Sequence, residues 1–516
     1  MRTGPAHFIE DGQTCSRRLS AYALNAGGRL LAAVTRPDCA VQPGSEGVVI
    51  LVSVYILGAG FSRAVSAHMP LTDELGNACI AAEPALASEV PGGRFIGGNF
   101  EAWLSERAED QPYFSPAQNS ASRSTYFRII ELVAKVLRDG EVDALASAAP
   151  DWLLELVELW HAERAVVITF NYDTLVEVAV QDAKLHDPHT NVIVPWSTAI
   201  NFTPRGFSGA TYGEIEQSAQ WSTFALLKLH GSLNWFWTPG DAAGATIVRG
   251  ELQGQFGNAK PFTEAERQRW FPGREPLLVP PAAAKSSYYA NPIAREIWRR
   301  AYDALSTAER VTFVGYSLPV TDFAMSGMLS ESLARATGME IEVVDVSPAP
   351  VVDRIEALLP GAKVVVRGGS TPIEDMVRVR RAALLDAVPA RVQAAARSAG
   401  ELRVAVSWSN GAVAAALAVV RESDTCVVLL EGIGQIWFAT REDRSTRSDV
   451  PGFDEREPLS ASELANALEG CTRIRARLSD GSELEVFGAT VRSFEGENSG
   501  HGTWLTLAPS GLGLDL

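Results

Sequence analysis

Six short apolar runs, separated by longer stretches with helical spacing, constrain most strongly what this chain can fold into. The runs are 54–57, 165–170, 225–229, 310–315, 341–346 and 363–367. Most are apolar throughout, as expected of strands that are covered on both faces. Their alternation with helical stretches predicts an α/β fold, namely a doubly wound, mostly parallel, Rossmann-like sheet.

The rest of the chain divides around this pattern. We expect residues 1–51 to be a poorly ordered leader, with an over-extended start as an open alternative. Residues 52–385 are expected to form the main domain, in which 93–150 contain two amphipathic helical patterns and read as a helical insertion. Residues 400–516 are predicted to form a small α+β domain of unknown role.

Three signals define the expected elements of that last domain. The alanine-rich segment 411–420 is expected to be a helix between two strands. Ser460 and Glu463 have the spacing of a capping box, which predicts a helix start. Asp480-Gly481 lies between the segments 472–478 and 483–487, which predicts a β-hairpin.

Composition limits the classes of function. The net charge of −17 disfavours direct binding of nucleic acid. The longest apolar run, 48–57, is too short for a membrane span and lacks the features of a signal peptide, which predicts a cytoplasmic protein. The five cysteines are dispersed and are expected to be reduced thiols without a zinc site. His186 and His189 are expected to lie in a turn, so no metal is predicted.

Small or polar residues follow the first three predicted strands. The first strand ends at Gly58-Ala59-Gly60, which suits either a phosphate-binding turn or a plain strand-to-helix turn. The second is followed by Asn171 and Asp173, which either face a ligand or cap the next helix. The third is followed by His230, which is either catalytic or structural.

Two later strands repeat the arrangement. Gly315 and Ser317 follow one of them and Asp345 follows the next, where each could contact a ribose or a phosphate or form a turn. Because the carboxyl ends of parallel strands share one edge of a sheet, the five motifs are expected at one crevice. Their coincidence, rather than any single motif, is the evidence for a site.

Taken in order, these motifs resemble the sirtuin superfamily over roughly residues 52–370. The resemblance implies that the glycine turn binds the phosphates of NAD, and that Asn171 and Asp173 face its ribose and nicotinamide. It implies that His230 is the catalytic base and that the later motifs bind the adenosine half. The implied NAD-binding residues are Gly58, Ala59, Gly60, Phe61, Ser62, Asp173, Gly315, Ser317 and Asp345, and the implied catalytic residues are Asn171 and His230.

The departures from that family point to one branch. Protein-deacylating sirtuins have a four-cysteine zinc module and a Pro-Asp-Phe-Arg segment, and this chain lacks both. Phe170 stands where those enzymes usually have glutamine. The pattern is closer to bacterial sirtuin-like proteins of antiphage defence, which implies an NAD+ glycohydrolase that uses NAD as substrate and needs no metal.

Two other functions stay open at this point. One is NAD-dependent protein deacylation, and the other is a non-catalytic sensor of ADP-ribose or a related nucleotide. Because an unregulated NAD hydrolase would kill its host, we expect gating, through a homo-oligomer and through an activating partner such as an ATPase. The helical insertion and the segment from 400 onward are the places where such regulation is expected.

Overall fold

The fold is taken from a computed structural model. It describes residues 53–90, 95, 99–185, 193–200, 221, 223–238, 241, 247–282, 286–289, 291–333, 339–398, 402–407, 413–430, 459–477, 481, 483–494 and 502–510. The whole predicted leader, residues 1–51, lies outside the described residues, and so does the turn at His186 and His189. The predicted limits of the domains stay predictions.

A six-stranded sheet positions the candidate site. Its strands are β1 (Ser53–Leu57), β2 (Val166–Thr169), β3 (Ala225–Lys228), β9 (Arg310–Val314), β10 (Glu340–Val344) and β11 (Lys363–Arg367). They lie in the order β11-β10-β9-β1-β2-β3, and every neighbouring pair is parallel. The chain therefore reverses its winding direction between β1 and β9, which is the strand order of dinucleotide-binding folds. This confirms the predicted fold class.

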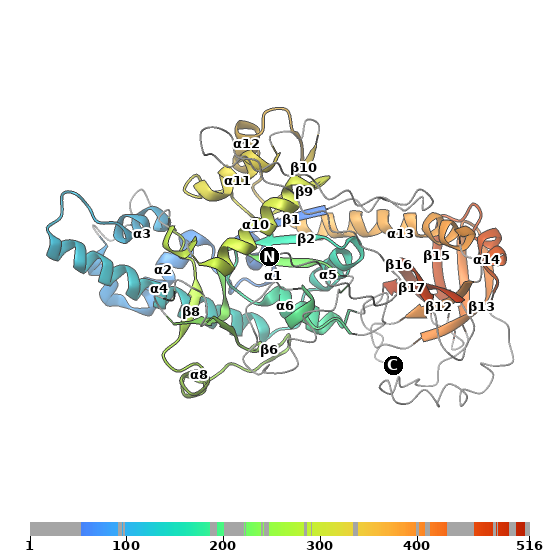
Figure 1. Ribbon diagram of the computed structural model, residues 1–516, viewed down its shortest axis with the longest axis horizontal. Coiled ribbons are helices and arrows are strands. Elements are labelled where there is room, and N and C mark those ends of the chain that lie inside the picture. Colours follow the sequence, from blue (N-terminus) through green and yellow to red (C-terminus); the bar gives the residue numbers. More distant parts are fainter. Residues whose placement is uncertain are drawn as a thin grey trace, which may run out of the picture. The chain divides into compact units, whose positions relative to one another are not determined.

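Helices cover both faces of the sheet, which explains why the strands are apolar throughout (Figure 1). On one face, alternate strand residues pack with α1 (Ala59–Val65), α5 (Asp151–Glu163) and α6 (Leu175–Ala183). On the other face, the remaining strand residues pack with α10 (Pro292–Ser306), α11 (Phe323–Leu333) and α12 (Ala349–Leu358). Tyr55 and Leu57 lie in the first core, and Val54 and Ile56 in the second.

The predicted amphipathic helices of the insertion are present as α3 (Phe100–Ala108) and α4 (Pro116–Leu145). They follow α2 (Thr72–Ala82) and a short 3₁₀ turn, η1 (Pro84–Glu89). Helix α4 begins with a capping box, in which Ser115 and Gln118 bond each other's backbone N–H groups. Its buried residues recur at helical spacing, and they end at Glu141, Ala144 and Leu145.

Smaller elements lie between β3 and β9. A three-stranded sheet contains β4 (Gly231–Trp237), β5 (Val248–Arg249) and β8 (Glu275–Leu278), and β6 (Gly254–Gln255) pairs with β7 (Asn258–Ala259). The helical pieces are a π-helix, η4 (Trp196–Ile200), and α8 (Glu264–Trp270) and α9 (Ser286–Tyr289).

A long helix, α13 (Pro372–Ser398), leads to the last domain. Its first half packs on the sheet, where buried Arg380 pairs with Glu342 of β10. Its second half packs in the core of a closed barrel. The barrel strands are β12 (Leu402–Ser407), β13 (Val413–Glu422), β14 (Thr425–Leu430), β15 (Arg473–Arg477), β16 (Glu483–Phe494) and β17 (Gly502–Ser510), and α14 (Ala461–Ala467) completes the small α+β domain.

The expectations for this domain are partly confirmed. The capping box at Ser460 starts α14, and β15 and β16 form the predicted antiparallel hairpin. The predicted helix at 411–420 is wrong, because that segment contributes β13, which pairs with β12 on one side and β14 on the other. Alanine favours helices, but pairing within a closed sheet overrides that preference.

The expectation of reduced thiols is wrong for Cys426 and Cys471 and is confirmed for Cys79, whereas Cys15 and Cys39 lie outside the described residues. Cys426 of β14 and Cys471 form a disulfide, with Cα atoms 6.1 Å apart. Their 45-residue separation carried no signal of pairing in the sequence. Cys79 is a buried free thiol.

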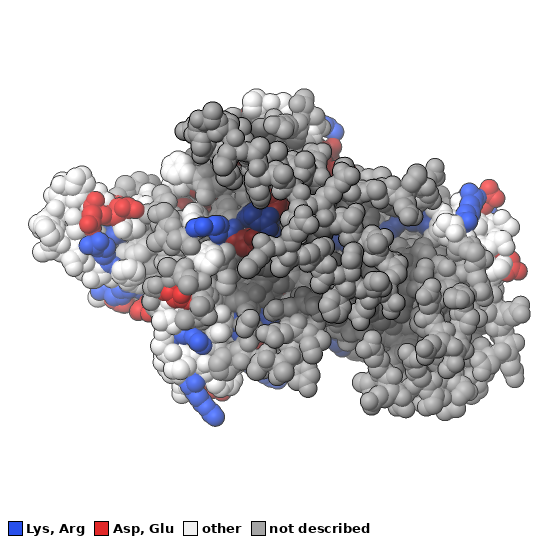
Figure 2. All heavy atoms as spheres, viewed as in Figure 1, with Lys and Arg blue, Asp and Glu red and all other residues white. Residues whose placement is uncertain are grey.

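Surface charge is mixed on the face that Figure 2 shows. Basic and acidic side chains of the described residues lie interspersed there rather than gathered by sign. Elsewhere in the described residues, Arg299 with Glu296 and Lys135 with Asp139 form ion pairs on helix surfaces. Among the described helices, none has the length and apolar character needed to cross a membrane.

Candidate functional site

The five predicted motifs meet at one edge of the sheet. The last residues of the central strands lie in register, with Leu57 opposite Thr169 and Val314. Thr169 in turn lies opposite Lys228, and Val314 opposite Val344. The residues that follow these positions are Gly58, Phe170, Leu229, Gly315 and Asp345. The carboxyl edge at the β1–β9 switch point is where open parallel sheets bind nucleotides.

The glycine turn after β1 is pressed against the turn after β9. A Cβ atom on Gly58 would lie 2.6 Å from the Cα of Tyr316, and one on Gly60 would lie 2.8 Å from the carbonyl oxygen of Gly315. The N–H groups of Gly58 and Gly60 donate to the carbonyls of Val314 and Gly315. This packing explains the need for glycine at both positions, and their contact with NAD phosphates stays a prediction.

Gly315 is the most restricted position of this turn. Its φ is +57°, and a Cβ atom there would lie 2.3 Å from the backbone nitrogen of Phe61. We expect Gly315→Ala to lower the free energy of unfolding by about 3 kcal/mol, because it adds a backbone clash to an unfavourable φ. Gly361 is the matched control, since its φ is +103° and the space around it is open. Urea unfolding of both alanine variants measures the difference, and equal losses would contradict the close approach of the two turns.

Asn171 is held by the glycine turn in a defined orientation. Its Nδ2 donates to the carbonyl oxygen of Gly58 and to Ser62 Oγ, both at 2.8 Å. The carbonyl of Gly58 can only accept, so the side-chain nitrogen must face it. Both Nδ2 protons are thereby used, and Oδ1 is the atom of this half-buried amide that can accept a bond from a substrate.

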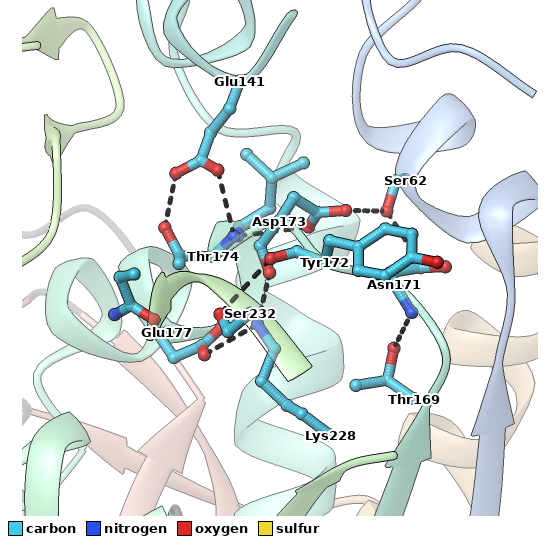
Figure 3. Close-up of polar contacts among 12 residues, drawn as sticks. Ser62, Glu141, Thr169, Asn171, Tyr172, Asp173, Thr174, Glu177, Lys228 and Ser232 are labelled. Atoms are coloured by element: carbon cyan, nitrogen blue, oxygen red, sulfur yellow. Dashed lines mark hydrogen bonds and ion pairs between the residues drawn. The ribbon is translucent and has the colours of Figure 1, made fainter. Parts of the chain in front are cut away.

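Ser62 and Asp173 extend this arrangement. Ser62 Oγ donates to Asp173 Oδ2 at 2.6 Å, and both side chains are buried. The other carboxylate oxygen, Oδ1, accepts from the N–H of Leu175 at 3.3 Å, so Asp173 also serves the start of α6. Asp173 thus supports Ser62 and, through it, Asn171 (Figure 3), and it also accepts from the N–H of the first residue of α6.

His230 lies beside the same segment. It is 6% exposed, and its ring lies edge-on to Phe170 with centroids 4.9 Å apart. It also stacks near Tyr172, with centroids 6.3 Å apart. The residues on both sides of Asn171 therefore contact the His230 ring. Phe170 in turn stacks on Tyr316 at 4.6 Å, which links this group to the turn after β9.

Among the described residues, the side-chain contacts of the remaining predicted residues do not link them to Asn171 or His230. Phe61 is buried, and its ring packs against Trp152 and Trp160 in the core. Ser317 is exposed, and one carboxylate oxygen of Asp345 accepts from the N–H of Ser347 at 2.7 Å, which is a turn contact. Ala59 begins α1 beside the glycines. The roles assigned to these residues stay predictions.

A buried charged cluster next to Asp173 escaped the sequence analysis. Lys228 Nζ lies 3.0 Å from Glu177 Oε1 and also donates to the backbone carbonyl of Asp173. Glu141 of α4 accepts from Thr174 Oγ1 at 2.5 Å and from its N–H at 3.3 Å. Lysine within an apolar strand was a signal for Lys228. Glu141 carried no such signal, because a glutamate in a long helix usually faces solvent.

Burial raises the pKa of Glu141 to about 7 from its ordinary value of 4.5, opposed in part by the bond from Thr174. Because the folded-state pKa is the higher one, this group favours the folded state at low pH, and that contribution is lost as pH rises through 7. We expect the stability of the wild type to fall between pH 5 and pH 8 by about 2 to 3 kcal/mol more than that of Glu141→Gln. Urea unfolding at both pH values measures this, and parallel pH profiles would contradict it.

Comparison with known proteins finds only distant structural relatives. No family model and no curated protein matches the sequence. Among solved structures, a complex of a Sir2 homologue with NAD is 16% identical, with 64% of this chain and 90% of that chain covered and a TM-score of 0.30. A structure from work on the mechanism and regulation of Sir2 enzymes is 12% identical, with 64% of this chain and 90% of that chain covered and a TM-score of 0.28.

A third structure, from work on the substrate affinity of sirtuins, is 13% identical, with 64% of this chain and 92% of that chain covered and a TM-score of 0.28. Identities and TM-scores this low do not carry a function from those proteins to this one, so the chemistry must be argued from the residues of this site.

Proposed function

We propose that this chain is an NAD+ glycohydrolase, which cleaves the bond between nicotinamide and ribose to give nicotinamide and ADP-ribose. One observation carries the proposal. Asn171 is oriented at the carboxyl edge of the sheet, and both of its neighbours in the chain contact the buried ring of His230. An oriented amide and an imidazole at a dinucleotide-binding edge are a suitable pair for this reaction.

The residues fit NAD as a substrate at the level of fold and chemistry. The winding reverses between β1 and β9, and the turns after these strands, at Gly58 and Gly315, lie in contact. Folds with this reversal bind dinucleotides across it. Asn171 and His230 lie on the β2 and β3 side of the reversal, and Gly315 and Asp345 lie on the β9 and β10 side. The two halves of a dinucleotide would accordingly be served by different strands.

The reaction requires the protein to position the ribose and the attacking water and to supply one general base. The nicotinamide of NAD+ is a pyridinium cation that departs as a neutral molecule, so no acid is needed to expel it. The transition state resembles an oxocarbenium ion at the ribose. Asn171 would use Oδ1 to accept from a ribose hydroxyl or from the attacking water. His230 would accept a proton from the same hydroxyl or water, which is a role that histidine performs near neutral pH.

The sequence of the domain favours hydrolysis over protein deacylation. Cys79 is the only cysteine between residues 52 and 385, so this part of the chain cannot form the four-cysteine zinc module that deacylating sirtuins have. Cys426 and Cys471 are in the barrel domain and are joined to each other. In deacylating sirtuins the zinc module helps to frame the acyl-lysine cleft, so other residues would have to form that side of a cleft in this chain.

We further infer that the activity is gated and belongs to antiphage defence in the cytoplasm, as the resemblance to that bacterial branch implies. An ungated enzyme would exhaust the NAD of its own cell. The insertion helices α3 and α4 and the barrel are the proposed places for oligomerisation and for an activating partner, such as an ATPase.

Nicotinamide release tests the proposal. The purified full chain is incubated with NAD, alone and with the products of neighbouring genes, and nicotinamide and ADP-ribose are separated by chromatography. Release in equal amounts without a peptide supports hydrolysis. Release only in the presence of an acyl-lysine peptide, with O-acyl-ADP-ribose as the product, would show deacylation instead. ADP-ribose binding without turnover in any mixture would show a sensor.

A further inference from the structure

Helix α4 reaches the candidate site through one buried carboxyl group. Glu141 is 0% exposed and lies near the end of this helix. Its Oε1 accepts from Thr174 Oγ1 at 2.5 Å, and its Oε2 accepts from the N–H of Thr174 at 3.3 Å. Figure 3 shows this carboxyl group above Thr174, on the side opposite Lys228. Thr174 is itself buried, so both bonds are shielded from water.

A peptide link and further hydrogen bonds connect Thr174 to the side-chain amide of Asn171. Thr174 follows Asp173 directly, and Asp173 Oδ2 accepts from Ser62 Oγ at 2.6 Å. Ser62 Oγ accepts in turn from Asn171 Nδ2 at 2.8 Å. A chain of hydrogen bonds and one peptide link therefore joins α4 to the side chain of Asn171.

The same segment is held from a second side. Lys228 of β3 donates to the backbone carbonyl of Asp173 and pairs with Glu177 of α6. The backbone from Asn171 to Thr174 thus lies between a lysine of the sheet and a glutamate of the helical insertion. Other bonds hold the start of this segment, such as that from the N–H of Leu233 to the carbonyl of Tyr172, whereas Lys228 and Glu141 hold its end at Asp173 and Thr174.

The charges around Glu141 make its protonation state important. Asp173, Glu177 and Lys228 face it from other elements, and Arg138 of α4 also interacts with its charge. Burial raises the pKa of Glu141 to about 7. Below that pH a neutral carboxyl group bonds Thr174, whereas above it a further negative charge lies beside Asp173 and Glu177.

We propose that Glu141 is a positioning residue for NAD cleavage, whose buried carboxyl group holds Thr174 and thereby sets the place of Asn171. This inference rests on the proposed function. Ionisation of Glu141 introduces repulsion toward Asp173, which loosens the segment and lowers turnover. The helical insertion therefore acts on the reaction through this buried contact.

A matched control separates positioning from general stability. Glu158 of α5 is also a buried glutamate, and burial also raises its pKa to about 7. Its partner is Arg381 of α13, at 3.5 Å, rather than a residue of the site. Removing the charge of Glu158 should change the pH dependence of stability as Glu141→Gln does, without changing the pH dependence of turnover.

The experiment measures nicotinamide release by the full chain from pH 5.5 to 8.5, together with the affinity for ADP-ribose. We expect kcat of the wild type to fall above about pH 7, and kcat of Glu141→Gln to stay level there. The uncharged amide can replace both bonds, because its Oε1 can accept from the N–H of Thr174 while its Nε2 donates to Thr174 Oγ1. Glu141→Ala should lower kcat by about tenfold to a hundredfold, while KM and the Kd for ADP-ribose change less than about threefold. Glu158→Gln should keep the wild-type pH profile.

Three results would overturn the inference. They are an alanine variant with wild-type kcat, a glutamine variant that keeps the decline above pH 7, and a Glu158 variant that also loses this decline. If the alanine variant does not fold, the glutamine variant decides the question. A wild type that releases no nicotinamide in any mixture contradicts the proposed function instead, so the two failures are distinguishable.

Discussion

Replacing His230 is expected to lower kcat for nicotinamide release by about a hundredfold or more, which is the usual contribution of a general base. The ring is 6% exposed and contacts Phe170 and Tyr172, so His230→Ala leaves a space among aromatic side chains. His230→Gln fills most of that space and has no group that titrates near neutral pH. Both variants should lose activity, and the glutamine variant should keep the wild-type unfolding transition.

His161 of α5 provides the control for this prediction. Its Nδ1 lies 2.8 Å from Thr223 Oγ1, so it too is a hydrogen-bonded, partly buried histidine, but no motif of the site includes it. His161→Gln should cleave NAD at a rate close to that of the wild type. A folded His230→Gln that releases nicotinamide as fast as His161→Gln would remove His230 from the mechanism.

Asn171→Ala is expected to cause a loss of similar size for a different reason. It removes Oδ1, the acceptor that would orient the ribose or the water, and it also removes the bonds from Nδ2 to Ser62 Oγ and to the carbonyl of Gly58. The base would remain, but the reacting groups would no longer be aligned, which typically costs about a hundredfold. Turnover by both Asn171→Ala and His230→Ala at the wild-type rate would contradict this site altogether.

The sheet could be predicted because its strands, apart from the partly exposed edge strand β11, are covered on both faces. Two-sided burial leaves continuous apolar runs, such as the one at 165–170, and β2 (Val166–Thr169) lies inside that run. Parallel strands also place their carboxyl ends together, so the meeting of Gly58, Asn171 and His230 at one edge followed from the fold class alone. The sequence motifs were therefore informative about place, even where each was weak by itself.

The errors arise where long-range pairing decides the structure. The segment 411–420 contains the residues that form the best helices, but its backbone bonds β12 and β14. The pairing of Cys426 with Cys471 depends on the barrel, which brings together residues that are 45 apart in sequence. Neither outcome has a local signature, because the interactions that determine it come from other strands.

The glycine turn shows a subtler limit. Gly58 and Gly60 could be recognised as positions without room for a side chain, but the sequence suggests a phosphate as the neighbour. In the structure the neighbour is the backbone at Gly315 and Tyr316. Likewise, Glu141 looks like any helix glutamate until α4 is docked with its buried face toward Thr174. Such contacts between distant segments have no counterpart in spacing or composition.

Replacing Lys228 is expected to have the largest effect on stability. Its side chain and that of Glu177 are each 1% exposed, and they form an ion pair at 3.0 Å. Removing one partner leaves a buried charge without compensation, which typically costs about 3 to 5 kcal/mol. Lys228→Met should therefore lower the free energy of unfolding by about that amount, as measured by urea unfolding at pH 7.

The double variant Lys228→Met/Glu177→Leu tests the cause of this loss. Glu177 Oε2 makes no hydrogen bond within the described part of the chain, so the glutamate gains little from its surroundings besides the lysine. If the loss in Lys228→Met comes from the uncompensated charge of Glu177, removing that charge should recover a large part of the stability. The double variant still lacks the donor to the carbonyl of Asp173, so its turnover should stay low even where its stability returns.

Lys135 and Asp139 of α4 supply the exposed counterpart. Their ion pair has the same length, 3.0 Å, but the two side chains are 59% and 65% exposed. Water already screens such a pair, so Lys135→Met should change stability by less than about 0.5 kcal/mol. If Lys228→Met lowers the free energy of unfolding no more than Lys135→Met does, the buried cluster does not support the segment that carries Asn171. The proposed positioning role of Glu141 would then lack the support that Lys228 gives to the same segment.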